Sequence, residues 1–140
     1  MDIANIPIFA MLRARMGYLS DRQRVIAENV ANASTPGYAP HDLKPFNFQA
    51  QVQQAAQTGA SALAVTQPGH MQSKSATTGS SAAVKPVKTA DSETTLDGNS
   101  VVLEEEMMKL TEARMDYDAA VGFYQKSLDI LKLATRKPGG

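Results

Sequence analysis

The chain has 140 residues, enough for one domain of ordinary size or less. Its 14 basic and 14 acidic residues cancel, so the charge balance points neither to nucleic acid nor to an anionic membrane. Cysteine is absent, which excludes disulfides, thiol catalysis and cysteine-based zinc sites, and the two histidines, His41 and His70, lie far apart in sequence.

The first residues do not resemble a cleavable signal peptide. MDIANIPIFAMLRAR carries Asp2 where a basic region is expected, and Asn5 and Pro7 interrupt its apolar residues. The chain has no run of 18 apolar residues that could span a bilayer. We therefore expect a soluble protein, or one that leaves the cell by a route that needs no such signal.

Residues 1–35 are predicted to contain a long amphipathic helix. Its arginines give it a basic surface complementary to the acidic start of the C-terminal helix, and we interpret them as a solvated face rather than an anion site. Its apolar residues recur at helical spacing and form one narrow stripe, interrupted by Gln23. The stripe consists of Leu12, Met16, Leu19, Ile26 and Val30.

The helix ends in NVANASTPGYAP, residues 29–40. The proline at position 36 disfavours helical geometry at the residue before it, so the helix must end there or earlier. Residues 35–38 fit a type II turn, with Gly37 at the position that requires a positive φ. Asn29 and Asn32 can bond the free carbonyls and turn amides with their side chains. By its physics alone, this segment is an effective helix terminator.

Residues 36–100 contain this turn and a polar, irregular insert. Between Pro45 and Val84 the only charged residue is Lys74, and the segment is rich in Gln, Ala, Ser, Thr and Gly. Such a composition cannot bury enough apolar surface to fold alone. We expect the insert to be partly mobile, or folded only against partners.

Residues 101–140 are predicted to form a second amphipathic helix. Asp97-Gly98-Asn99-Ser100 supplies turn formers and an N-cap before Val101. We interpret the run Glu104-Glu105-Glu106 as charges that complement the helix dipole and add solubility. The apolar stripe, interrupted once by Arg114, consists of Leu103, Met107, Leu110, Tyr117, Val121, Tyr124, Leu128 and Leu131.

The fold is therefore predicted to be mainly α. The long N- and C-terminal helices should pair as a coiled-coil-like hairpin, because both carry one narrow apolar stripe of the kind that coiled coils use. The polar middle segment connects them.

The side chains that could act in catalysis or bind a metal are not arranged as a catalytic or metal site. His70 has no second histidine or cysteine at ligand spacing, and Ser34 and Thr35 have no nearby base. The three consecutive glutamates face different sides of a helix, and no phosphate-binding glycine loop is present. We expect neither an enzyme nor a cofactor-binding protein.

The helix exit resembles the signature shared by bacterial flagellar rod, hook and related axial proteins. The residues that carry this resemblance are Asn29, Ala31, Asn32, Thr35, Pro36, Gly37 and Tyr38. Residues 97–134 and the short motif at residues 66–71 resemble the proximal rod proteins of that family, with the sister rod protein FlgC as the competing assignment. Pro40-His41 departs from the residues expected after the signature.

The resemblance implies a structural subunit of the flagellar basal-body rod, the drive shaft that crosses the periplasm. Such subunits are exported unfolded by the flagellar type III apparatus without signal cleavage, and they are needed for flagellum assembly and motility. Their terminal helices pack with those of neighbours into a tube, so the two stripes would form an assembly seam. The implied partners are copies of the chain, the rod proteins FlgC, FlgF and FlgG, the adapter FliE, the membrane ring FliF and the export gate.

A helical adapter or secretion cofactor that binds a partner helix without polymerising is the alternative function. The turn signature at the helix exit favours the rod subunit, since an adapter hairpin needs no such joint. Imaging of the chain with its neighbours distinguishes the two.

Overall fold

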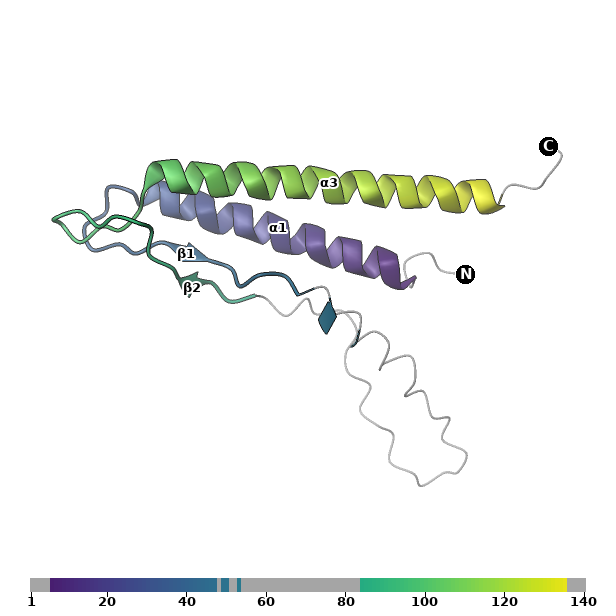
Figure 1. Ribbon diagram of the computed structural model, residues 1–140, viewed down its shortest axis with the longest axis horizontal. Coiled ribbons are helices and arrows are strands. Elements are labelled where there is room, and N and C mark those ends of the chain that lie inside the picture. The colour runs from purple at the N-terminus through teal and green to yellow at the C-terminus, as the bar shows by residue number, and fades with distance from the viewer. Residues whose placement is uncertain (1–5, 48, 51–52, 54–83, 136–140) are drawn as a thin grey trace, which may run out of the picture.

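The computed structural model describes residues 6–47, 49–50, 53 and 84–135. Two long helices, α1 (Pro7–Ala31) and α3 (Leu103–Thr135), lie side by side and run in opposite directions (Figure 1). The predicted mainly α hairpin is confirmed. The motif at residues 66–71, with His70, and most of the polar insert lie outside the described residues.

The sequence of α1 explains where the helix begins and ends. Pro7 is its first residue, a position where the missing N–H of proline is not needed for a helical hydrogen bond. The helix ends at Ala31, before the predicted limit, and the backbone N–H of Asn32 closes it by donating to the carbonyls of Glu28 and Asn29. Neither helix described here is apolar enough over a sufficient length to cross a membrane.

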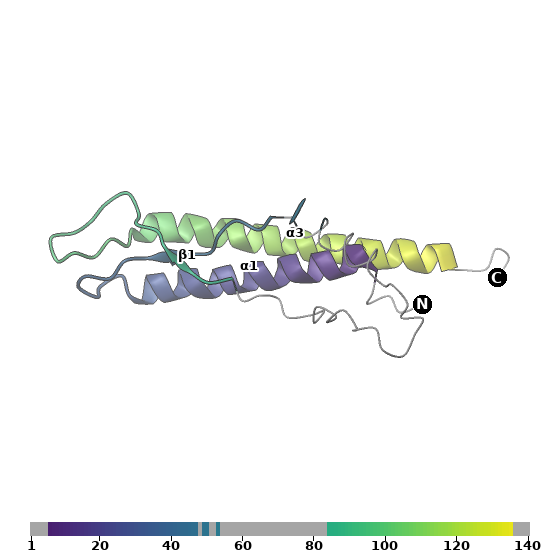
Figure 2. The same ribbon diagram turned by 90° about the horizontal axis from the view of Figure 1, so that it is seen from below.

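The two helices differ in length. α1 has 25 residues and α3 has 33, so at 1.5 Å per residue they measure about 38 and 50 Å. The ring of Phe9 in the first turn of α1 meets Tyr124 edge-on, with centroids 5.3 Å apart. The last turns of α3 consequently extend past the start of α1 (Figures 1 and 2).

The interface between the helices is built on small side chains of α3. Ala113 and Ala120, one heptad apart, are buried against α1. Small residues at this spacing let two helix backbones approach closely, so the interface is centred on the alanines rather than on the large residues of the predicted stripe. Leu103 and Met107 are exposed, while the other six members flank the alanines and are partly covered: Leu110, Tyr117, Val121, Tyr124, Leu128 and Leu131.

The stripe of α1 faces α3 more nearly as expected. Leu19 and Ile26 are buried, and Leu12, Met16 and Val30 are partly covered. Phe9 and Val25 are also buried, although the predicted stripe did not include them. Whether the positions of either stripe serve assembly stays a prediction.

A short antiparallel sheet lies beside α1. β1 (His41–Asp42) pairs with β2 (Val87–Lys88), with His41 opposite Lys88. Arg22 of α1 binds the carboxylate of Asp42 with two nitrogens, Nε and Nη2, each at 3.1 Å. The Arg22 side chain is only 17% exposed, so its interpretation as part of a solvated basic face is wrong. The guanidinium ties the returning chain to the helix instead.

Ala113→Leu tests the small-residue interface. We expect it to lower the free energy of unfolding by about 1–3 kcal/mol, because the added carbons have no room between the helices. Ala119→Leu, at an exposed position of α3, should change stability by less than about 0.5 kcal/mol. Urea unfolding followed by circular dichroism measures both. Equal effects of the two substitutions would contradict the packing described here.

Candidate functional site

The turn after α1 has the predicted geometry. The backbone N–H of Tyr38 donates to the carbonyl of Thr35 at 3.2 Å, which closes a four-residue turn. Gly37 has φ of 70°, the left-handed value that the third position of a type II turn requires. The turn directs the chain sharply away from the axis of α1 and back toward β1 (Figure 1).

Asn32 caps the end of α1, as predicted. Its Nδ2 donates at 2.9 Å to the carbonyl of Glu28, which also accepts the backbone N–H of Asn32 in the last turn of the helix. Its Oδ1 accepts the hydroxyl of Thr35 at 3.2 Å. The side chain therefore joins the last turn of the helix to the turn that follows.

Asn29 has partners that the sequence did not reveal. It was expected to bond the free groups at the helix end, but its buried amide reaches other segments instead. Nδ2 donates to the carbonyl of His41 at 2.7 Å and to Oε2 of Glu106 at 2.8 Å. Oδ1 accepts the N–H of His41 at 2.9 Å and the hydroxyl of Tyr38 at 3.2 Å. All four hydrogen-bonding positions of the amide are used.

A second turn, residues 97–100, docks on the first. Nδ2 of Asn99 donates to the carbonyls of Asn32 and Thr35, at 3.0 and 2.7 Å. The N–H of Gly37 donates to the carbonyl of Asp97, and the N–H of Ser100 donates to that of Tyr38, both at 3.0 Å. The sequence predicted this segment only as a cap for the second helix. Its Asp-Gly pair signals a tight turn but carries no information about what the turn contacts.

The second turn is also held by contacts of its own. Gly98 has φ of 83°, and a Cβ at this position would lie 3.4 Å from the Cα of Gly37. Oδ1 of Asp97 accepts the hydroxyl of Thr95 and the N–H of Asn99, and these bonds lower the pKa of the Asp97 carboxyl. The two left-handed glycines thus lie next to each other where the two turns are in contact.

The start of α3 is held by charged side chains that the sequence assigned to solvent. Glu106 is fully buried and accepts Nζ of Lys109 at 2.8 Å in addition to the amide of Asn29. Its interpretation as a solvated charge near the helix dipole is therefore wrong. Glu105 accepts hydrogen bonds from Ser92 at the surface, and Glu104 is exposed.

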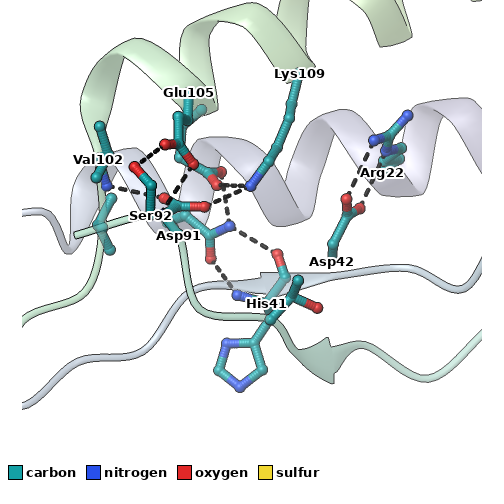
Figure 3. Close-up of polar contacts among 12 residues, drawn as sticks. Arg22, His41, Asp42, Asp91, Ser92, Val102, Glu105 and Lys109 are labelled. Atoms are coloured by element: carbon teal, nitrogen blue, oxygen red, sulfur yellow. Dashed lines mark hydrogen bonds and ion pairs between the residues drawn. The ribbon is translucent and has the colours of Figure 1, made fainter. Parts of the chain in front are cut away.

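Asp91 completes this cluster from outside the helix. Its Oδ2 accepts the N–H of Val102 at 2.8 Å, and its Oδ1 lies 2.6 Å from Nζ of Lys109 (Figure 3). Burial alone would lower the pKa of Lys109, but the hydrogen bonds to Asp91 and Glu106 outweigh it and raise the pKa. Every buried side-chain nitrogen and oxygen among the described residues has a partner.

A hollow in the described surface is also lined by paired charges. A cavity of about 580 Å³ lies between the helices and the chain around β1. Arg22 binds Asp42 on one of its walls, and Arg15 lies 3.6 Å from Asp116 on another. Among the residues that the structure describes, no group of three His, Cys, Asp or Glu side chains could hold a metal ion.

The turn at residues 35–38, the turn at residues 97–100 and the buried contacts of Asn29 and Glu106 form one connected unit, which we name the joint. Its side chains fix the angle between α1, the returning strand and α3, and the hydrogen-bonding groups that do so are already bonded to one another. Five of the seven signature residues take part through the contacts described here: Asn29, Asn32, Thr35, Gly37 and Tyr38. Ala31 and Pro36 are exposed.

Comparison with known proteins points to one kind of protein. A family model described as "Flagella basal body rod protein" matches residues 15–38, which include the whole signature. The chain is 34% identical over 115 residues to the flagellar basal body rod protein FlgB of Agrobacterium fabrum, covering 81% of each chain. It is 29% identical to the FlgB of Salmonella typhimurium over 70% of each chain, and 25% identical to that of Aeromonas hydrophila over 97% of this chain and 98% of the other.

Gly37→Val tests whether the turn depends on a positive φ. A Cβ at this position meets no atom within 4 Å, so any cost comes from the backbone conformation alone. We expect valine to lower the free energy of unfolding by about 1–3 kcal/mol. Asparagine tolerates the left-handed region and should cost less. Thermal unfolding of both variants measures the difference, and equal losses would show that the turn does not impose this conformation.

Proposed function

The chain belongs to the FlgB family of flagellar basal body rod proteins and is a structural subunit of that rod, and we propose that it packs into the rod through a second apolar face of α3. We name this face the outer stripe. It consists of Met108, Met115, Phe123 and Ile130.

The outer stripe is the observation that carries the proposal. Its four side chains are 71, 64, 64 and 60% exposed. Spacings of seven, eight and seven residues keep them within about 80° of the helix circumference, on a face centred about 110° from the one that carries Ala113 and Ala120. A helix with apolar residues on two faces is suited to two neighbours, and within this chain only one of these faces is covered by α1.

Burial of the outer stripe would supply much of the energy for assembly. Removing a side chain of this size from water stabilises a complex by roughly 1.5–3 kcal/mol. Contacts of this kind that do not close on themselves, repeated from subunit to subunit, generate a helical filament. The joint would support such contacts by holding each subunit's two helices and returning strand at one fixed angle.

The partners follow from the family assignment. We propose that the neighbours are copies of the chain and the rod proteins FlgC, FlgF and FlgG. We also propose a position at the cell-proximal end of the rod in the periplasm, next to the adapter FliE, the membrane ring FliF and the export gate. The alternative of an adapter that does not polymerise has lost its support, because the relatives are rod proteins by name.

We propose that the subunit travels through the flagellar export apparatus without signal cleavage, and that it acts without catalysis or a cofactor. The absence of cysteine suits a chain that must stay unfolded in transit and then fold outside the cytoplasm. The seven signature residues and the two predicted stripes would serve assembly in this account.

Phe123→Asp tests the outer stripe. We expect loss of the subunit from the rod and loss of swimming, because the substitution places an unpaired charge in an apolar interface. The helix content of the purified variant should match that of the unsubstituted chain, since Phe123 is 64% exposed in the hairpin. Swimming assays and immunoblots of isolated basal bodies measure incorporation.

Gln125→Asp is the matched control. It introduces the same charge two residues away, at an exposed position that lies on neither apolar face of α3. We expect it to swim normally. Normal swimming of Phe123→Asp cells, or an equal defect in both variants, would contradict the proposed role of the outer stripe.

A further inference from the structure

One ion pair fastens the segment that leads back to the helices. Residues 84–96, which we name the strap, run from β2 to the turn before α3 (Figure 1). The large apolar residues of the strap, Val84, Val87 and Leu96, are all exposed. Asp91 is the one strap residue that is not exposed, and its side chain is fully buried. The strap, which is described throughout its length, thus has a single buried side-chain anchor in the body of the protein.

The other attachments of the strap are backbone hydrogen bonds and surface contacts. β2 pairs with β1 over two residues, and the N–H of Thr89 donates to the carbonyl of Pro40 at 2.9 Å. Ser92 donates to Glu105 at an exposed position. Contacts of this kind are few and open to solvent, which is typical of segments that unfold locally.

The anchor works through a shared cation. Lys109 lies between Asp91 and Glu106, with its Nζ at 2.6 Å from the first carboxylate and 2.8 Å from the second (Figure 3). Both carboxylates are fully buried, and Lys109 is 23% exposed. Lys109 is the only cation bonded to either carboxylate among the described residues. Without Lys109, two like charges would remain buried without a counter-ion.

The two carboxylates belong to different parts of the structure. Glu106 is also bonded to Asn29 of α1, so it stays within the helix pair whether or not the strap is docked. Asp91 comes from the strap, and its second oxygen accepts the backbone N–H of Val102, the residue before α3. Among the described residues, the buried apolar side chains lie in α1, in α3 or at Pro40 and Leu43, and none lies in the strap.

We infer that Asp91 and Lys109 form a latch on which the strap opens and closes as a unit while α1 and α3 stay paired. The inference does not depend on the function in the rod. It follows from the position of the one buried strap side chain and from the independence of the apolar core from the strap.

Limited proteolysis of the full chain tests the latch. Endoproteinase Glu-C cleaves after Glu93 in the strap and after Glu112 in α3, so one digestion reports on both parts. We expect Lys109→Met to speed cleavage after Glu93 roughly tenfold, since cleavage rates follow the population of the open form. Cleavage after Glu112 and the helical circular dichroism signal should stay at the level of the unsubstituted chain. Lys126→Met, which removes an exposed lysine of the same helix, should change neither rate.

Asp91→Asn removes the latch charge from the strap but leaves Glu106 paired with Lys109, so no buried charge loses its counter-ion. The amide can still accept the N–H of Val102, and Lys109 keeps Glu106, so we expect a smaller increase in cleavage after Glu93. Adding Lys109→Met to Asp91→Asn should have less effect than Lys109→Met alone, because the Asp91 charge has gone.

Three results would overturn the latch. The first is cleavage after Glu93 at an unchanged rate in Lys109→Met and Asp91→Asn. The second is loss of helix signal together with the strap, which would make the two parts one cooperative unit. The third is multiplication of the two single effects in the double variant, which would show that the side chains act independently.

Discussion

The buried amide of Asn29 is the contact on which the joint depends. It lies in the last turns of α1, yet its four hydrogen bonds connect the signature turn, the returning strand and α3. An amide in this position has no water to replace a lost partner, so every segment that it contacts must be in place for the joint to form. The side chain therefore couples the local turn chemistry to the long-range pairing of the helices.

Three parts of the molecule have separate roles around this contact. The alanines of α3 let the helices approach closely, the docked turns fix the direction of the chain, and the outer stripe is exposed and open to the neighbours that we propose. The division suits a structural subunit, because its contacts with neighbours keep one geometry only if its own helices do not shift. A joint whose hydrogen-bond donors and acceptors are all paired resists such movement better than an apolar contact does, since each hydrogen bond has a preferred direction.

The sequence predicted the features that depend on neighbouring residues. The type II turn at Thr35–Tyr38 and the cap by Asn32 follow from residue types within a few positions, and both were predicted correctly. The helices were also predictable, because apolar residues recur at helical spacing between residues that start and end a helix. The resemblance to flagellar rod proteins, carried by the signature, was confirmed by the comparisons.

Features that depend on distant residues were not predictable from the pattern. Asn29 and Glu106 lie 77 positions apart, and Asn99 lies 67 positions from Asn32, so nothing in the local sequence indicates either pair. The centre of the helix interface was missed for a different reason. The prediction rested on the large apolar residues of α3, whereas the apolar residues of α3 that are fully buried are the small Ala113 and Ala120.

The exchange of the Asn29 side-chain protons is the most direct measurement of the central claim. In a nuclear magnetic resonance experiment, the two Nδ2 protons of Asn29 should exchange with solvent far more slowly than those of Asn47, whose side chain is exposed. One of these protons is bonded to the carbonyl of His41 and the other to Oε2 of Glu106. Slow exchange of both would show that these hydrogen bonds are formed in solution. Exchange of the Asn29 protons as fast as those of Asn47 would contradict the account.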